Sequence, residues 1–219
     1  MSIAKFLAFP AVFAIFLAAC GEVDGEFEDI SSSSNYGANS SSSFDIGLEW
    51  MPPPDSSFVH GAVQITLDTF YISKNLITQN QYKKVMGENP SKVKKDTLPV
   101  DGVTWFKAVE FCKKLSLLMG LDSNAVKLPT EAQWEYVAIP SVIQRNTDYW
   151  EWTNDCWDNN FPYEPNNPSG PPNCLERDYK VRKGFAKRVD ERYATDPNLL
   201  SISGSYISFR VVLKKKFLD

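Results

Sequence analysis

The sequence is poor in the residues that most metal sites and disulfide-rich scaffolds require. It has a single histidine, His60, among 219 residues, and only 4 cysteines. One imidazole excludes the sites that need two or three, such as those of HExxH metalloproteases, three-histidine zinc enzymes and facial-triad iron oxygenases. Four cysteines are too few for a small secreted fold built on disulfides.

An excess of positive charge is also missing, because 23 lysines and arginines stand against 27 acidic residues. The net charge of -4 leaves no basic footprint, so we expect no nucleic-acid partner. What the chain does contain is 13% aromatic and 43% hydrophobic residues. This composition is typical of a globular protein and excludes disorder over the whole length.

The first residues predict a targeting signal. Lys5 precedes the uncharged run Phe6–Ala19, which is shorter than the roughly 20 residues of a membrane span and suits a signal peptide. The run ends in Leu-Ala-Ala-Cys-Gly, which resembles the bacterial lipobox, with Cys20 as the lipidated residue. The alternative is an ordinary signal peptide with a coincidental cysteine. We expect a signal peptide at 1–19 and anchoring of Cys20 by acyl chains, at about 0.8 kcal/mol per buried CH2.

The residues after Cys20 predict a tether. Five acidic residues and two runs of four serines fill the stretch before residue 44. Such a composition buries too little apolar surface to fold, so we expect 20–43 to be a flexible spacer and 44–219 to be one domain. The predicted location is the cell envelope, outside the cytoplasm. Gly21, in place of aspartate, favours the outer membrane in a bacterium with two membranes.

Short strand and helix signals alternate along 44–219. Alternation predicts a strand at 63–67, and an apolar run predicts a strand at 70–72. The segment 207–213 is typical of a final strand. Thr78 with Gln81, and Thr130 with Gln133, have the spacing of capping boxes and predict helices from 78 to about 86 and from 130 to Pro140. An apolar stripe over 108–115 predicts a third helix between them. The class is therefore α+β.

Four stretches together resemble the formylglycine-generating enzyme family, also called sulfatase-modifying factors. They are Phe70–Tyr82, Leu98–Cys112, Leu128–Tyr136 and Trp150–Asp155, of which Leu-Pro-Thr-Glu-Ala-Gln-Trp-Glu-Tyr is the most specific. The resemblance covers about 45–213 and implies a variant of the C-type-lectin-like fold, with few short strands and helices and much irregular loop. Trp134, Trp150 and Trp152 are interpreted as core residues of such a fold.

The resemblance implies a copper-dependent oxidase that converts a sulfatase cysteine to formylglycine through two C-terminal cysteines. In the family these follow a run resembling Arg-Val-x-Arg-Gly-Gly-Ser-Trp, which corresponds here to the stretch Val181–Arg188. No cysteine follows that stretch, so we expect neither copper nor the family's oxidation. The iron-dependent sulfoxide synthases of the family need several histidines, which His60 alone does not supply.

The resemblance leaves calcium as a candidate ion. One of the family's calcium sites falls in a segment that is short here, 139–149. The other maps onto Gln144, Thr147, Tyr149 and Glu151, a weak site because it contains a single carboxylate. The alternative for Glu151 is an ion pair.

The three remaining cysteines predict one disulfide. Cys156 and Cys174 enclose 17 residues, and thiols outside the cytoplasm tend to pair, although both could stay free. Some family members bridge the position of Cys112 to the position occupied here by Val211. We therefore expect Cys112 to be a buried free thiol.

A charged run over 177–192 is the candidate binding surface. Arg182, Lys183, Arg188 and Arg192 would bind an anionic glycan or peptide; the alternative is a solvated face. We therefore expect a membrane-anchored lipoprotein, without catalytic activity, that binds a glycan or an envelope protein. An oxidoreductase of the family with altered chemistry is the alternative, and a structural part of an envelope or motility complex is a third hypothesis.

Overall fold

The computed structural model describes residues 45–51, 57–60, 62–138, 143, 145–146, 148–158, 164–175, 178–184, 193–199, 201–202 and 205–214. Residues 41–219 form one compact unit. The predicted signal peptide, Cys20 and the tether lie outside the described residues. No helix in the described ranges has both the length and the apolar character that crossing a membrane requires.

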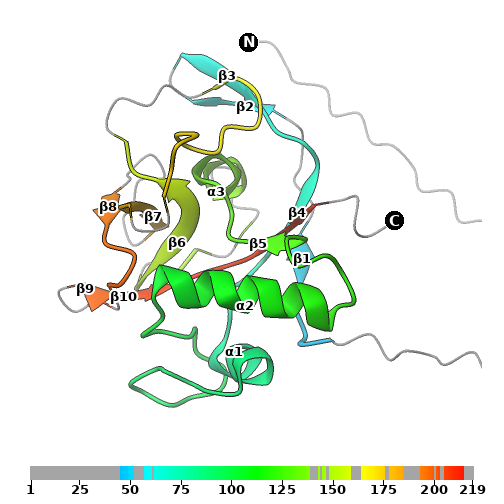
Figure 1. Ribbon diagram of the computed structural model, residues 1–219, viewed down its shortest axis with the longest axis vertical. Helices are drawn as coiled ribbons and strands as arrows, with labels where there is room; N and C mark the ends of the chain where they lie inside the picture. Colours follow the sequence, from blue (N-terminus) through cyan, green and yellow to red (C-terminus); the bar gives the residue numbers. More distant parts are fainter. Residues whose placement is uncertain are drawn as a thin grey trace, which may run out of the picture. The chain divides into compact units, whose positions relative to one another are not determined.

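Short helices and strands follow one another along the domain (Figure 1). The helices are α1 Gln79–Met86, α2 Trp105–Leu118 and α3 Glu131–Ala138. The first five strands are β1 Trp50–Met51, β2 Ser57–His60, β3 Val63–Thr66, β4 Phe70–Ser73 and β5 Val126–Lys127. The others are β6 Tyr149–Cys156, β7 Lys180–Gly184, β8 Tyr193–Thr195, β9 Ser201–Ile202, β10 Ser205–Ser208 and β11 Val212–Lys214. The α+β class predicted from the sequence is confirmed.

The strands form three small sheets. A four-stranded antiparallel sheet has the order β1-β4-β11-β5. A five-stranded sheet has the order β8-β7-β6-β10-β9, in which β10 runs parallel to β6 and the other neighbours are antiparallel. Strands β2 and β3 pair as a separate hairpin.

Local capping signals set the start of two helices, as predicted. The Thr78 hydroxyl accepts from the Gln81 amide at 3.3 Å, and the Gln81 side chain accepts from the Thr78 amide at 2.9 Å. Thr130 and Gln133 repeat both hydrogen bonds at 3.2 and 2.9 Å. These bonds satisfy amides that a helix start leaves without partners, which explains why both starts could be read from residues three apart.

The prediction of one strand over 207–213 is wrong. The chain leaves the five-stranded sheet after β10 and joins the four-stranded sheet at β11, so 209–211 is not a strand. The sequence does not reveal such a change of sheet, because mostly apolar residues, all buried, lie on both sides of Arg210. The break places Arg210 between the two sheets, where its side chain is fully buried.

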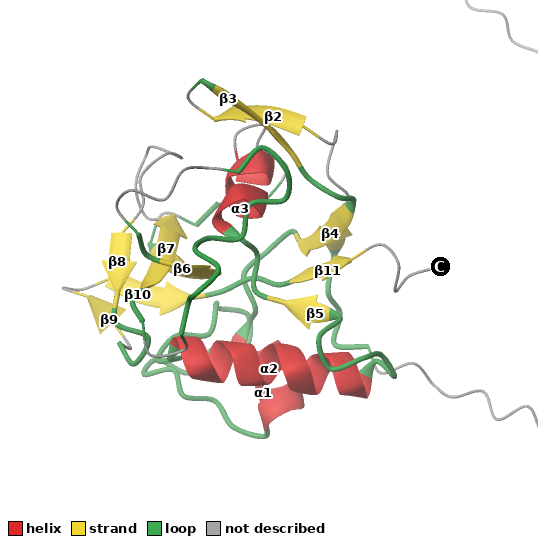
Figure 2. Cartoon of the chain, turned by 45° about the horizontal axis from the view of Figure 1, so that its top comes forward, coloured by secondary structure: helices red, strands yellow, loops and turns green. Residues whose placement is uncertain are grey.

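The helices cover the sheets on different sides (Figure 2). Helix α2 packs against α1 and β5, and α3 packs against β6 and β7. Both views show the β2–β3 hairpin beyond α3, away from α2, and the Phe58 ring contacts the Tyr136 ring at 5.4 Å between centroids. Trp134, Trp150 and Trp152 are all buried in the hydrophobic clusters, which confirms their predicted role in the core.

Candidate functional site

Glu151 is the third residue of β6 and forms a buried ion pair with Arg210. Arg210 donates to its carboxylate from Nε at 2.6 Å and from Nη2 at 2.9 Å, and Trp134 Nε1 donates at 2.8 Å. The third nitrogen, Arg210 Nη1, donates to the carbonyls of Ser73 and Lys74 at 2.9 and 2.8 Å. This pair therefore links β6 and α3 to the end of β4.

These contacts change the role assigned to Glu151. Both carboxylate oxygens accept hydrogen bonds, from Arg210 and Trp134, so Glu151 is an ion-pair partner and calcium would share it with Arg210. Glu151 takes the alternative role of an ion-pair partner. Tyr149 lies at the start of β6, whereas Gln144 and Thr147 lie outside the described residues. In the described part of the chain, no three His, Cys, Asp or Glu side chains gather in a way that could hold a metal ion.

Lys183 is buried and does not line a ligand surface. Its exposed fraction is 0%, and Nζ contacts Glu135 Oε1 at 2.6 Å and Glu131 Oε1 at 3.3 Å, both on α3. Successive residues of a strand point to opposite faces, so Lys183 and Arg182 cannot act on the same ligand. This corrects the prediction that Lys183 binds an anion: it pairs with the carboxylates of α3.

Arg182 lies on the other face of β7 and has a different environment. Its guanidinium carbon lies 4.1 Å from the ring centroid of Trp150 and 5.2 Å from that of Tyr193. Nε and Nη1 are buried without a hydrogen-bond partner. Burial lowers the pKa of Arg182 to about 10, an effect that Tyr193 partly opposes, so the group stays charged at neutral pH. Arg188 and Arg192 lie outside the described residues.

Cys156 and Cys174 are joined by a disulfide between β6 and the loop that precedes β7. Lys180 lies against it, with Nζ 3.2 Å from each sulfur and 2.9 Å from the carbonyl of Leu175. The same ammonium group lies 4.2 Å from the ring centroid of Trp105, at the start of α2. The bridge thus holds the loop onto the buried end of the sheet.

Cys112 is a free thiol on the apolar side of α2, with an exposed fraction of 1%. Burial raises its pKa well above the usual range, so the thiolate is disfavoured. Its role as a buried free thiol agrees with the sequence-based expectation. The described domain therefore offers no pair of thiols to a metal.

Removal of the disulfide is expected to destabilise the domain by roughly 3 kcal/mol, the loop-entropy value for a bridge enclosing 17 residues. The double substitution Cys156→Ser and Cys174→Ser should lower the urea midpoint of unfolding. Wild-type protein in excess reductant should shift by a similar amount, whereas Cys112→Ala should leave the effect of reductant intact. Equal midpoints for oxidised and reduced wild type would contradict a structural bridge.

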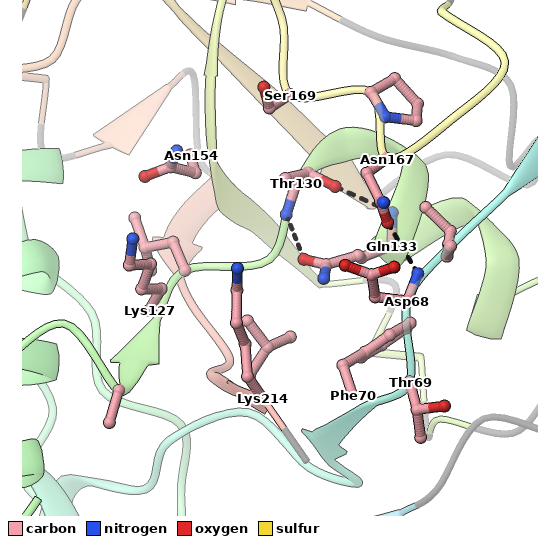
Figure 3. A pocket seen from close by; sticks show the side chains of 15 residues that line it. Asp68, Thr69, Phe70, Lys127, Thr130, Gln133, Asn154, Asn167, Ser169 and Lys214 are labelled. Atoms are coloured by element: carbon pink, nitrogen blue, oxygen red, sulfur yellow. Dashed lines mark hydrogen bonds between the residues drawn. The ribbon is translucent and has the colours of Figure 1, made fainter. Parts of the chain in front are cut away.

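A pocket of about 260 Å³ opens beside the four-stranded sheet (Figure 3). The lysines that line it lie on one face of that sheet, because Lys127 pairs with Val212 and Lys214 follows two residues later. In Figure 3, Asn154 and Ser169 lie in the upper part of the view, with Lys127 and Lys214 below them. Sequence reasoning missed this pocket, because its walls come from five separated segments and no local motif connects them.

Part of the chain matches a known family model. Residues 43–149 match the family model for the sulfatase-modifying factor enzyme 1-like domain. This match agrees with the resemblance to the formylglycine-generating enzyme family. One relative is the chaperone protein LppX of Paenibacillus barcinonensis, which is 31% identical over a match covering 41% of this chain and 46% of LppX. The chain thus spans less than half the length of that relative.

Solved structures establish the same fold at low sequence identity. Treponema denticola variable protein 1 superposes with a TM-score of 0.61 and 17% identity, covering 78% of this chain and 98% of that one. PvdO from Pseudomonas aeruginosa has a TM-score of 0.52 and 16% identity, covering 77% and 91%. CarF has a TM-score of 0.51 and 13% identity, covering 78% and 99%. The predicted fold of the family is confirmed.

Proposed function

We propose that this chain is a lipid-anchored protein of the cell envelope whose formylglycine-generating-enzyme-like domain binds a polypeptide without oxidising it. One observation carries the proposal. Cys156 and Cys174 are bridged and Cys112 is buried, so all three cysteines of the domain are withheld from chemistry. A copper-thiolate oxidase needs two available thiolates.

The anchoring part of the proposal is supported by the sequence before the domain. The uncharged run Phe6–Ala19 ends at Cys20, where a lipobox would place the modified cysteine. Acidic and serine-rich residues then separate Cys20 from the domain. In a bacterium with two membranes, Gly21 favours the outer one.

A polypeptide is favoured over a glycan as the ligand. The relative LppX is named a chaperone protein, and chaperones act on polypeptides. The domain offers a pocket of about 260 Å³ lined by polar and apolar side chains, and a buried arginine without a hydrogen-bond partner, Arg182. An envelope protein is therefore the partner that we propose.

The test measures binding and oxidation in one sample. A reduced, unfolded exported protein containing cysteine is diluted into buffer with the purified full chain, copper and oxygen. We expect less aggregation, followed by light scattering, and cysteines that mass spectrometry finds unconverted. Copper-dependent conversion of a cysteine to an aldehyde would favour the alternative, an oxidoreductase. Unchanged aggregation would contradict polypeptide binding.

A further inference from the structure

Arg182 differs from the other buried cations of the described residues in having no acceptor. Lys183 pairs with two carboxylates of α3, and Arg210 pairs with Glu151. Lys180 donates to the carbonyl of Leu175. Arg182 is only 7% exposed, yet neither Nε nor Nη1 has a hydrogen-bond partner.

Such an arrangement is costly in a protein without a ligand. A buried donor without an acceptor loses its hydrogen bonds to water and forms none with the protein. The free-energy cost is larger for a charged group. The rings of Trp150 and Tyr193 compensate in part, because aromatic faces attract cations. They accept no hydrogen bonds in the plane of the guanidinium, so its edges remain unsatisfied.

A second unsatisfied group lies on the same face of the sheet. Thr195 is 2% exposed, and its hydroxyl has no hydrogen-bond partner. Strand pairing sets Tyr193 opposite Arg182, and Thr195 opposite Lys180. Residues two apart share a face, so the Thr195 hydroxyl and the Arg182 guanidinium are diagonal neighbours on it. A hydroxyl and a guanidinium can donate together to one anionic group.

The guanidinium also has a route to solvent. Nη2 has no protein partner, and unlike Nε and Nη1 it is not among the buried unpaired nitrogens, so it is the nitrogen in contact with solvent. Nη2 shares one edge of the planar group with Nε and another with Nη1. An oxyanion arriving at Nη2 can therefore reach a second nitrogen and form two parallel hydrogen bonds.

We infer that Arg182 and Thr195 form a recognition site for a carboxylate of the bound polypeptide, either an acidic side chain or the C-terminus. This inference rests on the proposed function, since it names the group of the ligand that the domain selects. The Trp150 ring covers the guanidinium, so the ligand approaches along an edge, and a planar carboxylate fits that approach. Desolvation of Arg182 strengthens the pairing, because charges attract more strongly away from water.

The inference is tested with two peptides that differ only in charge. The full chain carrying Cys20→Ser is titrated with a peptide containing glutamates and with the same peptide carrying glutamines, and binding is followed by tryptophan fluorescence. We expect the glutamate peptide to bind at least about tenfold more tightly, as for a charge-assisted pair. Arg182→Gln should abolish this preference, and Arg182→Lys should retain only part of it, because lysine lacks the planar fork.

The matched control is Lys84→Gln, which removes an exposed positive charge of α1 and should keep the full preference. The two peptides are compared on the protein that keeps Arg182, so this comparison tests the inference even if Arg182→Gln fails to fold. Equal affinity for both peptides would overturn the inference and leave polypeptide binding intact. Binding of a uronic-acid oligosaccharide but of neither peptide would also overturn the inference. The proposed function is tested separately by the aggregation assay, in which unchanged aggregation of the unfolded protein would contradict it.

Discussion

Substitution of Arg210 by methionine is expected to lower the free energy of unfolding by about 3–5 kcal/mol, the usual cost of breaking a buried ion pair on one side. The Glu151 carboxylate would remain buried with only Trp134 Nε1 as donor. The carbonyls of Ser73 and Lys74 would also lose a donor. Urea unfolding of wild type and variant at neutral pH measures the difference.

Two further variants distinguish the cost of breaking this buried ion pair from the cost of breaking an exposed one. Lys74→Ala breaks an exposed pair with Glu49 and should cost less than about 1 kcal/mol. Adding Glu151→Gln to Arg210→Met removes the uncompensated charge and should recover part of the stability. A loss below about 1 kcal/mol for Arg210→Met would contradict the role of this pair in joining the sheets.

The second large effect concerns Cys20. We expect Cys20→Ser to move the protein from the membrane fraction to the soluble fraction, because the acyl chains that anchor it could no longer be attached. Detergent phase partitioning of cell extracts measures the change, and labelled fatty acid should be incorporated into wild type alone. Cys112→Ala, which changes a buried thiol of α2, should stay in the membrane fraction. Retention of Cys20→Ser in membranes would contradict lipid anchoring at this residue.

Local signals were the part of the fold that the sequence predicted best. The capping boxes at Thr78 and Thr130 predicted the starts of α1 and α3, because each depends on residues only three apart. The segment 207–213 was predicted as one strand, where there are two. The change of sheet depends on long-range pairing, including the contact between Arg210 and Glu151.

The candidate site was predicted less completely. The charged run drew attention to Arg182, whose role in binding stays a prediction. Lys183 was grouped with it, although strand alternation sends the two side chains to opposite faces. Applying that alternation to Lys180–Gly184 would have separated them. The lack of hydrogen-bond partners for Arg182 Nε and Nη1 could not be predicted from the sequence. It depends on the rings of Trp150 and Tyr193, which pack near the guanidinium from other strands.

Counting the reactive thiols of the chain tests the central claim, that the domain withholds its cysteines from chemistry. The full chain carrying Cys20→Ser is treated with an alkylating reagent without reductant, first folded and then in urea, and the modified residues are identified by mass spectrometry. The account predicts no modification of the folded protein and modification of Cys112 alone after unfolding. Alkylation of both Cys156 and Cys174 in the folded protein would contradict it, because a thiol pair would then be available to copper.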